Sequence, residues 1–550
     1  MGKRLIWTVL AWNALAALAA GTATPALAQK TVTIVREIDT DRYDPQKSTS
    51  RSGAEVMYMI GDTLVNLDYD MKTLKPGLAM SWTVSPDGLT YTFKLRNDVT
   101  FCSGKKMTAK DVVATYERWL DPETKGLVKW RMGDVDKVTA PDDVTVEYKL
   151  KKPFSELLYQ MTQYFHTILN VEQAKQLGAD FGVKAFDGTG PYCLESWTPR
   201  DSTVLTKHAG YKWGPPIYDV TEAQVDKVIW KVVPEENTRV TALQAGQADV
   251  SQYVPYWSLK DLMADKKLSV TKAENYFWSY FIGFKVDKET VSDVRVRQAI
   301  NLAVDQKAIT DAVTFGFALP ADTMLIPGVL DFNPKLDKAA YGENVKQAEK
   351  LLDDAGWKKG PDNFRYKDGK KLAPLVYGIS GQFKEIAEAV QGDLRKIGID
   401  LQIQLFDSTV AWGKLATQEF DAFGMSFPYV SAGDALNLYF RSANTPTPNR
   451  MNWKDKETDE LLDKGMTATD DATRAAAYQA VQVKVHNAFV WIPLYHEPLF
   501  VVTGAKLKPI KGAWQLRLRP LQGAGHRVQV AGGAYHHLPL MFLAPARGRG

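Results

Sequence analysis

The chain has 550 residues, of which 45% are hydrophobic and 24% charged, and its formal net charge at pH 7 is +4. A chain of this length can bury large cores and should divide into two or three domains, and this composition excludes wholesale disorder. The positive charge belongs to the two ends: without Lys3 and Arg4 it is +2, and without the five arginines after residue 516 it is -3, so nucleic-acid binding is not indicated.

The first residues have the layout of a secretory signal peptide. Lys3 and Arg4 precede an apolar run, Ile6–Ala20, that is too short to span a membrane. The Ala-Leu-Ala sequence that ends at Ala28 fits the small-x-small cleavage rule, so residues 1–28 are expected to be removed. An uncleaved anchor is the alternative. No cysteine follows the apolar run, so a lipid anchor is not expected, and export of a soluble protein indicates the periplasm.

The next segment is predicted to alternate strand, loop and helix. Thr31–Val35 has the β-branched composition of a strand, and a polar loop runs from Tyr43 to Gly53. A helix is predicted at Val56–Val65. The loop is therefore a strand-to-helix connection, which can either be an ordinary turn or line a binding site.

The stretch Ala79–Trp119 has the clearest local signals. Ser85–Gly88 is predicted to be a turn, because its proline and glycine supply the fixed and the positive φ angle. Apolar and polar residues then alternate over Tyr91–Leu95, as in a strand with one buried face. Thr108 and Asp111 form a capping-box pattern at the start of an amphipathic helix.

The rest of the chain is predicted to be α/β. Two strand–helix–strand units, each typical of a parallel pair of strands, are predicted at residues 228–250 and 375–405. An aromatic strand at Tyr276–Phe284 lies between them. A long helix at Ala475–Phe489 precedes a final strand at Trp491–Val502.

Four longer motifs carry a resemblance to a known family. They are A-M-S-W…D-G-L-T-Y-T-F-K-L-R within Ala79–Trp119, G-T-G-P-Y at Gly188–Tyr192, N-T-R-V-T-A-L-Q-A-G-Q-A-D-V at Asn237–Val250 and D-V-R-V-R-Q-A-I at Asp293–Ile300. In order and spacing they resemble the family 5 extracellular solute-binding proteins, the oligopeptide and dipeptide receptors of ABC importers and their relatives. The resemblance covers roughly Thr31–Ile510.

This resemblance implies an α/β fold of the two-lobed periplasmic binding protein type (the Venus-flytrap fold), with an extra subdomain in the N-terminal lobe. Lobe I is expected at residues 29–275, with the inserted subdomain at about 60–187, lobe II at 276–492, and a return to lobe I at 493–515. Two crossings between lobes make a hinge. Residues 516–550 lack acidic side chains and periodicity, and we expect a disordered tail, either a frame-shifted or read-through end or a genuine extension.

The implied function is capture of peptides or peptide-like solutes and their delivery to the permease of an ABC importer, by a monomer that needs no cofactor. A nickel or metal-complex receptor, or an opine or sugar receptor of the same fold, is the alternative. A secreted hydrolase is a third hypothesis, but the sequence has no G-x-S-x-G, H-E-x-x-H, Walker A or G-x-G-x-x-G motif. Four scattered histidines are predicted to be structural, not catalytic or metal-binding: His166, His208, His486 and His496.

The chain has two cysteines, Cys102 and Cys193. Because an exported protein meets an oxidising compartment, and because both residues fall near turns or strand edges, we expect a disulfide between them. Two buried thiols are the alternative.

The ligand is expected to differ from a simple peptide. In peptide receptors of this family, a D-x-x-x-x-x-W-x-x-D strand end brings an aspartate to the α-ammonium of the peptide. Here Phe427 falls on the tryptophan position and Val430 on the aspartate position, while Asp434 matches a downstream loop. A buried ammonium without a carboxylate costs several kcal/mol. We therefore expect weak binding of free di- and tripeptides, and better binding of an N-blocked peptide, an opine-like conjugate or another polar metabolite.

Seven residues are predicted to contact the ligand. Arg51 could pair with a ligand carboxylate, although a solvated surface arginine is the alternative. Aromatic side chains would supply stackable walls. The predicted set is Ser50, Arg51, Trp130 and Arg131 from the first lobe, and Phe427, Tyr429 and Asp434 from the second.

Overall fold

The structure, a computed structural model, describes residues 30–550 apart from 69, 218–221, 253, 337–340, 416, 428–430, 505–506, 509–514, 518–528, 532–543 and 546–550. The predicted signal peptide thus lies outside the described residues. Within the part of the chain that is described, no helix combines the length and the hydropathy that crossing a bilayer requires.

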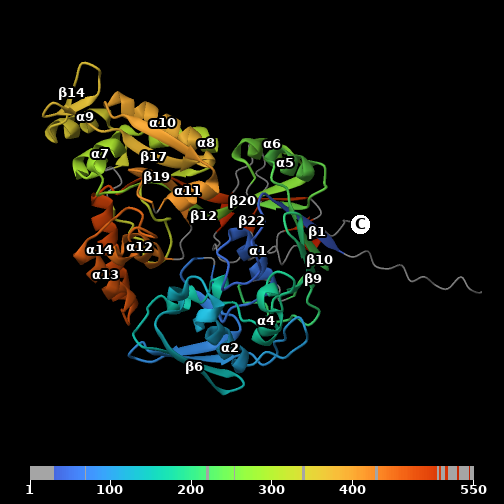
Figure 1. Cartoon of the computed structure of the whole chain (residues 1–550). Coiled ribbons are helices and arrows are strands. Elements are labelled where there is room, and N and C mark those ends of the chain that lie inside the picture. The colour runs from blue at the N-terminus through green and yellow to red at the C-terminus, as the bar shows by residue number, and fades with distance from the viewer. Residues whose placement is uncertain are drawn as a thin grey trace, which may run out of the picture.

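One eleven-stranded sheet runs through the molecule (Figure 1). Its strands lie in the order β18-β17-β19-β12-β20-β11-β1-β10-β9-β8, and β13 pairs with β20 outside this path. β1 is parallel to β10 and β11, and β17 is parallel to β18 and β19. The bounds are β1 Thr31–Arg36, β8 Tyr192–Thr198, β9 Ser202–Lys207, β10 Lys227–Val232, β11 Val250–Gln252, β12 Leu268–Phe284, β13 Leu319–Pro320, β17 Leu375–Ser380, β18 Leu401–Phe406, β19 Ala422–Phe427 and β20 Trp491–Gly504.

Helices cover both faces of the sheet around β1. Successive side chains of a strand point to opposite faces, so Ile34 packs with Val56 of α1 while Val35 packs with Leu243 of α5 in a separate core. The helices around β1 are α1 Arg51–Ile60, α5 Glu236–Gln244 and α6 Leu259–Ala264, whereas α4 Val171–Leu177 belongs to the subdomain described next. The strand–helix–strand unit predicted at residues 228–250 is β10, α5 and β11, and both strands are parallel to β1, which lies between them.

The subdomain, by which we mean residues 60–187, contains a separate four-stranded antiparallel sheet in the order β4-β5-β7-β6. Helix α2 packs on it and buries Tyr116 against Tyr148, their ring centroids 5.1 Å apart. The predicted capping box is present: Thr108 and Asp111 exchange both hydrogen bonds at the start of α2. The elements are β2 Val65–Leu67, β3 Leu74–Pro76, β4 Ala79–Val84, β5 Thr90–Leu95, α2 Ala109–Leu120, β6 Val135–Asp142, β7 Thr145–Leu150 and α3 Leu157–Gln160.

The other half of the large sheet carries two groups of helices (Figure 1). Ile300, Leu352 and Leu394 form one core with the strands β17 and β18, and Leu436 and Tyr478 form another. The helices are α7 Val294–Ala303, α8 Gln306–Thr314, α9 Val345–Asp354, α10 Lys384–Lys396, α11 Ser408–Lys414, α12 Ala432–Phe440, α13 Lys456–Met466 and α14 Asp471–Asn487. A small three-stranded sheet, β14 Lys358–Lys359, β15 Arg365–Lys367 and β16 Lys370–Lys371, lies at its margin.

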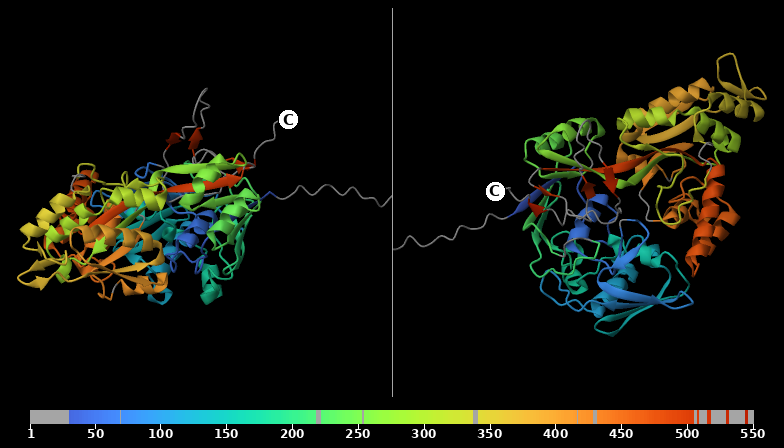
Figure 2. Two further views of the ribbon diagram at one scale, coloured as in Figure 1. Left: turned by 90° about the horizontal axis from the view of Figure 1, so that it is seen from above. Right: turned by 180° about the vertical axis from the view of Figure 1, so that it is seen from behind.

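The two halves are joined by the long strands β12 and β20. They pair antiparallel from Leu268 opposite Gly504 to Gly283 opposite Trp491, with irregularities in register along the way. β12 also pairs with β19, and β20 with β11, so the two strands belong to both halves at once. The view from behind in Figure 2 shows the subdomain below this junction.

Several boundaries differ from the sequence-based expectations. The helix predicted at Val56–Val65 is α1 and begins earlier, at Arg51, because the Ser50 side chain caps it. β12 begins at Leu268, ahead of the predicted aromatic run. The predicted tail contains described strand pairs at β22 Gln515–Arg517, β23 Gln529–Ala531 and β24 Ala544–Pro545, and its other residues after 517 lie outside the described part of the chain.

Candidate functional site

The N-terminus of α1 holds the first two predicted contact residues. Ser50 accepts a hydrogen bond from the backbone N–H of Gly53, and its Oγ lies 2.8 Å from Oγ of Ser52. The Arg51 Nη2 donates to Oε1 of Glu37 over 2.8 Å, and the Arg51 side chain is 27% exposed. Arg51 is therefore held in one orientation at the surface of the first lobe.

Glu37 follows β1 directly and links two arginines. Its other oxygen, Oε2, lies 3.9 Å from Nη2 of Arg239. Arg239 is itself buried and donates to the carbonyls of Val233 and Pro234, both over 2.8 Å. Glu37 thus connects a fixed, buried guanidinium to the partly exposed guanidinium of Arg51.

The guanidinium of Arg51 lies 5.9 Å from the ring of Trp278, which is a residue of β12. Across the β12–β20 pair, Trp278 stands opposite Glu497. The Glu497 carboxylate accepts hydrogen bonds from the hydroxyls of Tyr256 and Tyr280, each over 3.1 Å. Burial raises the pKa of Glu497, and the tyrosine hydroxyls and the Arg51 charge oppose that rise.

The second lobe approaches the same part of β12. Phe427 is the last residue of β19 and stands opposite Ser279, the neighbour of Trp278. The Phe427 side chain lies outside the described part of the structure, as do Tyr429 and Val430 entirely. The backbone register therefore places position 427 beside Ser279, the residue next to the Trp278 that Arg51 contacts. Because successive residues of a strand point to opposite faces, the register alone does not place positions 51 and 427 on the same face of the sheet.

The other predicted pair of the first lobe lies in the subdomain. Trp130 is 40% exposed, and the guanidinium of Arg131 lies 4.4 Å from its ring and 5.1 Å from the ring of Phe165. Arg131 Nη1 also donates to Oε1 of Gln160. Cation–π contact on two sides fixes a charged side chain that is almost fully buried.

Arg131 reaches across to the second lobe. Its Nη1 lies 3.3 Å from Oδ1 of Asp434, and the two side chains are 6% and 3% exposed. Asp434 is in the first turn of α12, where its backbone N–H donates to the capping hydroxyl of Ser431 over 2.9 Å. Two residues that were predicted as separate ligand contacts are therefore partners of each other.

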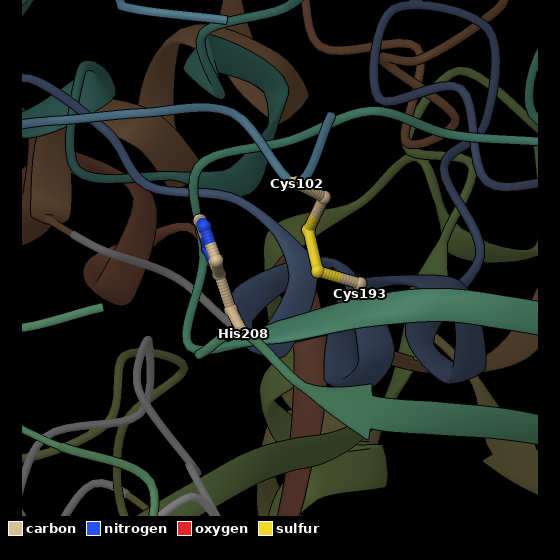
Figure 3. Close-up of side chains that lie close together, drawn as sticks. All are labelled: Cys102, Cys193 and His208. Carbon is tan, nitrogen blue, oxygen red and sulfur yellow. A yellow bond between two sulfur atoms is a disulfide. The ribbon is translucent and has the colours of Figure 1, made fainter. Parts of the chain in front are cut away.

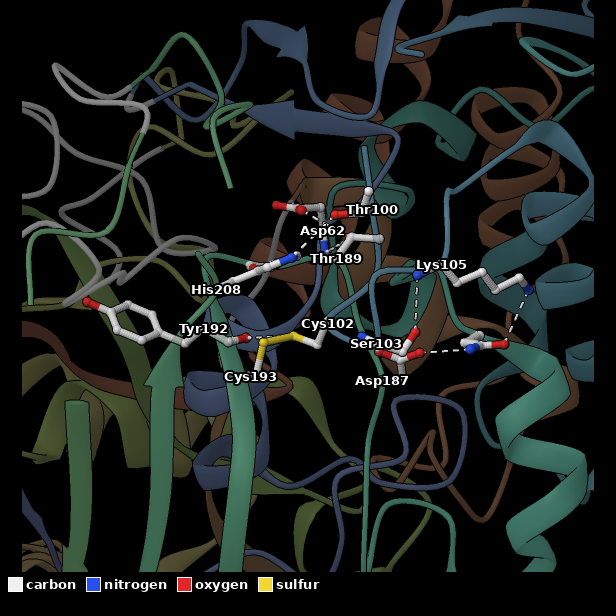
Figure 4. The surroundings of a disulfide bond; sticks show 12 residues. Asp62, Thr100, Cys102, Ser103, Lys105, Asp187, Thr189, Tyr192, Cys193 and His208 are labelled. Carbon is white, nitrogen blue, oxygen red and sulfur yellow. Dashed lines mark hydrogen bonds between the residues drawn. A yellow bond between two sulfur atoms is a disulfide. The ribbon is translucent and has the colours of Figure 1, made fainter. Parts of the chain in front are cut away.

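The two cysteines are joined by a disulfide, which ties the subdomain to β8 (Figure 4). Cys102 donates its backbone N–H to the Gly188 carbonyl over 2.9 Å, and the N–H of Ser103 donates to Asp187 over 2.9 Å. The disulfide thus lies beside the G-T-G-P-Y motif and fixes the place where the chain re-enters the large sheet.

The same cysteines and His208 form a group whose potential ligand atoms lie within 4.8 Å of one another (Figure 3). The sulfurs are bonded to each other, and a disulfide offers no thiolate to a metal. The His208 ring contacts the Gly190 carbonyl over 2.9 Å through Nδ1 and Thr100 over 3.4 Å through Nε2. This group is accounted for as structure, and it does not favour a metal site.

His166, like His208, is held by neighbouring side chains in a structural role. It is fully buried, its Nδ1 lies 3.1 Å from the hydroxyl of Tyr116, and its ring packs against Trp119. Burial lowers the pKa of His166 to about 3, so the ring is neutral at physiological pH. A neutral, enclosed imidazole fits the predicted structural role.

Comparison with known proteins supports the arrangement. The family model for bacterial extracellular solute-binding proteins, family 5, matches residues 73–448. The chain is 28% identical over 491 residues to the glutathione-binding protein GsiB of Escherichia coli O1:K1, covering 86% of this chain and 89% of the relative. The Escherichia coli protein is of similar length, so the likeness extends through both lobes.

Solved structures of other binding proteins also resemble this chain. AgaA of Agrobacterium tumefaciens R10 in complex with agropinic acid has a TM-score of 0.70 and 27% identity, covering 87% of this chain and 94% of AgaA. NikA of Brucella suis in complex with Fe(III)-EDTA has a TM-score of 0.79 and 24% identity, covering 94% and 100%, and shows the same fold. With its two-lobed α/β architecture and a family match over most of its length, the chain belongs to the bacterial extracellular solute-binding proteins of family 5.

Proposed function

We propose that this chain is the periplasmic receptor of an ABC importer for a peptide-like or opine-like solute that carries a carboxylate and lacks a free N-terminal ammonium. It is exported by removal of residues 1–28, acts as a monomer without enzymatic activity, and delivers its ligand to the permease subunits. The observation that carries the ligand class is the ion pair between Arg131 and Asp434.

A ligand ammonium would need a carboxylate of the protein as its partner. The family's ammonium-binding aspartate corresponds to Val430, which has no charge. The next acidic residue, Asp434, is 3% exposed and engaged with Arg131. An ammonium placed there would compete with a buried guanidinium, and leaving it unpaired costs several kcal/mol.

A ligand carboxylate, in contrast, has a prepared partner. Arg51 is partly exposed, is oriented by Glu37 and lies over Trp278. A guanidinium can bind a carboxylate through two parallel hydrogen bonds. We propose that the ligand contacts Ser50, Arg51, Trp130, Phe427 and Tyr429, with the Arg131–Asp434 pair bordering this set.

One relative supports such a ligand. The AgaA structure holds agropinic acid, an opine acid, whereas GsiB is named for glutathione, which carries a free α-ammonium as well as carboxylates. An opine-like acid therefore ranks ahead of a plain dipeptide, and ahead of a metal complex, among the probes for this chain. Glutathione is the counter-probe and should bind weakly if the charge argument holds.

The first experiment identifies the ligand directly. Mass spectrometry of small molecules that co-purify with the native protein should reveal a carboxylate-bearing metabolite, which the protein returns unchanged after incubation. Calorimetry should then show weak or no binding of free dipeptides and tighter binding of their N-acetylated forms. Tight binding of free dipeptides, undiminished in Asp434→Ala, would contradict the charge argument.

A matched pair of variants tests the carboxylate anchor. Arg51→Met should weaken binding of the co-purifying acid at least tenfold, because one charge-assisted pair is lost. Arg96→Met is the control, since Arg96 is 28% exposed and also pairs with a neighbouring carboxylate, that of Asp98. Equal effects of the two substitutions would remove Arg51 from the site.

A further inference from the structure

The subdomain contacts the second lobe at a small polar surface that is separate from the shared sheet. The backbone N–H of Ser155 donates to the Met466 carbonyl over 2.8 Å, and its Oγ donates to the Gly465 carbonyl over 2.8 Å. Met466 ends α13 and packs against the hydrophobic core of the first lobe. In sequence, this contact joins segments about as far apart as Arg131 and Asp434.

Glu156 lies at the centre of this contact. Its Oε2 accepts a hydrogen bond from the Ser431 hydroxyl over 2.6 Å, and the residue is 2% exposed. Gly433 lies so close that a Cβ atom there would be 2.4 Å from Oε1 of Glu156. Among the described residues, that oxygen has no hydrogen-bond partner. A carboxyl group is thus enclosed by the approach of α12, with only one oxygen satisfied.

Three charged groups of the second lobe act on Glu156. Arg474 of α14 lowers its pKa, while Asp331 and Asp434 raise it. Arg474 is itself paired with Asp331 over 2.7 Å, so its charge is largely committed within the second lobe. The Tyr478 ring lies about as close to Gly433 as Glu156 does, and it adds no charge at neutral pH because burial raises its pKa. The environment as a whole favours the protonated carboxyl.

We propose that this contact, made by Ser155, Glu156 and Arg131 of the subdomain with α12 and α13, is a closure latch outside the ligand contacts, and that Glu156 makes the latch proton-dependent. The inference rests on the proposed function in one respect, because it describes the closing movement that captures the ligand. It extends that function by assigning part of the binding affinity to residues that do not touch the ligand.

The topology requires the latch to open. Between the lobes the described chain crosses through β12 and β20, so the lobes can separate about these strands only if the contact at Ser155 and Glu156 breaks. A ligand that binds the closed form has an apparent dissociation constant inversely proportional to the closed fraction. Strengthening or weakening the latch should therefore change affinity for every ligand by the same factor.

The sign of the proton effect follows from burial. In the closed form, burial raises the pKa of Glu156 to about 7 from an ordinary value of 4.5. Opening hydrates the carboxyl and restores the ordinary value. Protonation of Glu156 therefore stabilises the closed form. This stabilisation is complete below pH 4.5, the ordinary pKa, and is lost as the pH rises through about 7. Between pH 6 and pH 8 the closed-to-open ratio should fall roughly tenfold.

The test measures closure without any ligand, in the full chain. Fluorophores are placed through reactive non-natural amino acids at positions 110 and 456, whose lysines in α2 and α13 are 80% and 91% exposed. Energy transfer should show a larger closed population at pH 6 than at pH 8. Glu156→Gln, which mimics the protonated carboxyl, should remain closed at both values, and Ser155→Ala should lower the closed population at both.

Asp62 provides the matched control. Its carboxyl is also buried, its pKa is raised to about 6 by burial, and its partners Thr189, Tyr211 and Trp213 all belong to the first lobe. Asp62→Asn should leave the pH dependence of closure unchanged. A pH-independent wild type, or a pH response that survives Glu156→Gln, would overturn the latch. Because no ligand is present, this result is separate from failure of the proposed ligand class.

Discussion

The two lobes meet in two places that differ in chemistry. At the shared sheet, β12 and β20 contribute strands of 17 and 14 residues and bury apolar side chains such as Phe281, Trp491 and Ile492. At the latch, a few hydrogen bonds and one ion pair join Ser155, Glu156 and Arg131 to α12 and α13. The sheet is continuous and apolar, so it holds in every state. The latch is small and polar, so water can replace it when the lobes part.

Two buried ion pairs sharpen this contrast. Arg474 and Asp331 are both 5% exposed and lie 2.7 Å apart within the second lobe. Arg131 and Asp434 are 6% and 3% exposed and lie 3.3 Å apart, but they belong to different lobes. Burial is the same, yet under the proposed closing movement only the second pair becomes hydrated without unfolding. Exposed fraction in one state is therefore a poor guide to what a charge contributes to stability.

The largest effect is expected in the shared sheet. Trp491→Ala should lower the free energy of unfolding by about 3–5 kcal/mol, because it leaves a cavity between Phe281 and Phe440, whose rings lie 5.0 and 5.4 Å away. Urea denaturation measures the loss. Val483→Ala, at a position 42% exposed, is the control and should change stability by less than about 0.5 kcal/mol. Equal losses of unfolding free energy in Trp491→Ala and Val483→Ala would mean that the shared sheet is not the main connection between the lobes.

Removing the carboxylate from each of the two ion pairs should lower the free energy of unfolding by clearly different amounts. Asp331→Asn should cost about 3–5 kcal/mol, since it removes the buried carboxylate from Arg474 and leaves it only the exposed Asp471 as an ion-pair partner. Asparagine tolerates the positive φ of 61° at position 331, so the substitution changes the charge alone. Asp434→Asn should cost about 1 kcal/mol or less, because the lobes can part and hydrate Arg131. Equal losses in urea denaturation would show that the lobes do not separate before unfolding.

The disulfide tests how the subdomain is attached to the first lobe. The double variant Cys102→Ser, Cys193→Ser should lose about 2–4 kcal/mol, because the bond closes a loop of 91 residues in the unfolded chain. Thiol titration of the unreduced, denatured wild type should find no free thiol. Two free thiols per chain would show that the disulfide is absent and that packing alone attaches the subdomain to the first lobe.

The smallest effect is expected at the C-terminus. β22 and β23 pair with each other, and β21 Leu507–Lys508 with β24, outside the eleven-stranded sheet. Truncation after Pro520 should therefore lower the melting temperature by no more than about 3 °C. A fall as large as that of Trp491→Ala would show that the tail supports the strands shared by the lobes.

Local signals were sufficient where a structure depends on neighbours in sequence. The capping box at Thr108 and Asp111, the alternating strand at Tyr91–Leu95 and the unit at 375–405 all lie where the pattern predicted them. α1 was placed too late, because the hydrophobic pattern begins after the cap, whereas the capping hydroxyl of Ser50 starts the helix. Hydrophobic periodicity shows which face of a helix or strand is buried, but it locates the ends of that element least accurately.

The candidate site was predictable only in part. Arg51 was identified as a possible anchor, but its partner Glu37 was not, because a lone acidic residue after a strand carries no pattern. Glu497 offered one signal, an acid within the apolar run W-I-P-L-Y-H-E-P-L-F. Glu156 offered none. Each acquires its role from residues that the fold brings from a distant part of the chain.

The sequence by itself determined the family, the α/β elements and the pair of cysteines, since these depend on long motifs, short-range periodicity and composition. Only the tertiary structure decided that Arg131 and Asp434 are partners, that Arg51 lies over Trp278, and that Glu156 is enclosed by α12. The physical reason is that charge and burial are properties of surroundings. A carboxylate has the same covalent structure in every sequence, and its pKa and its partner are set by what folds against it.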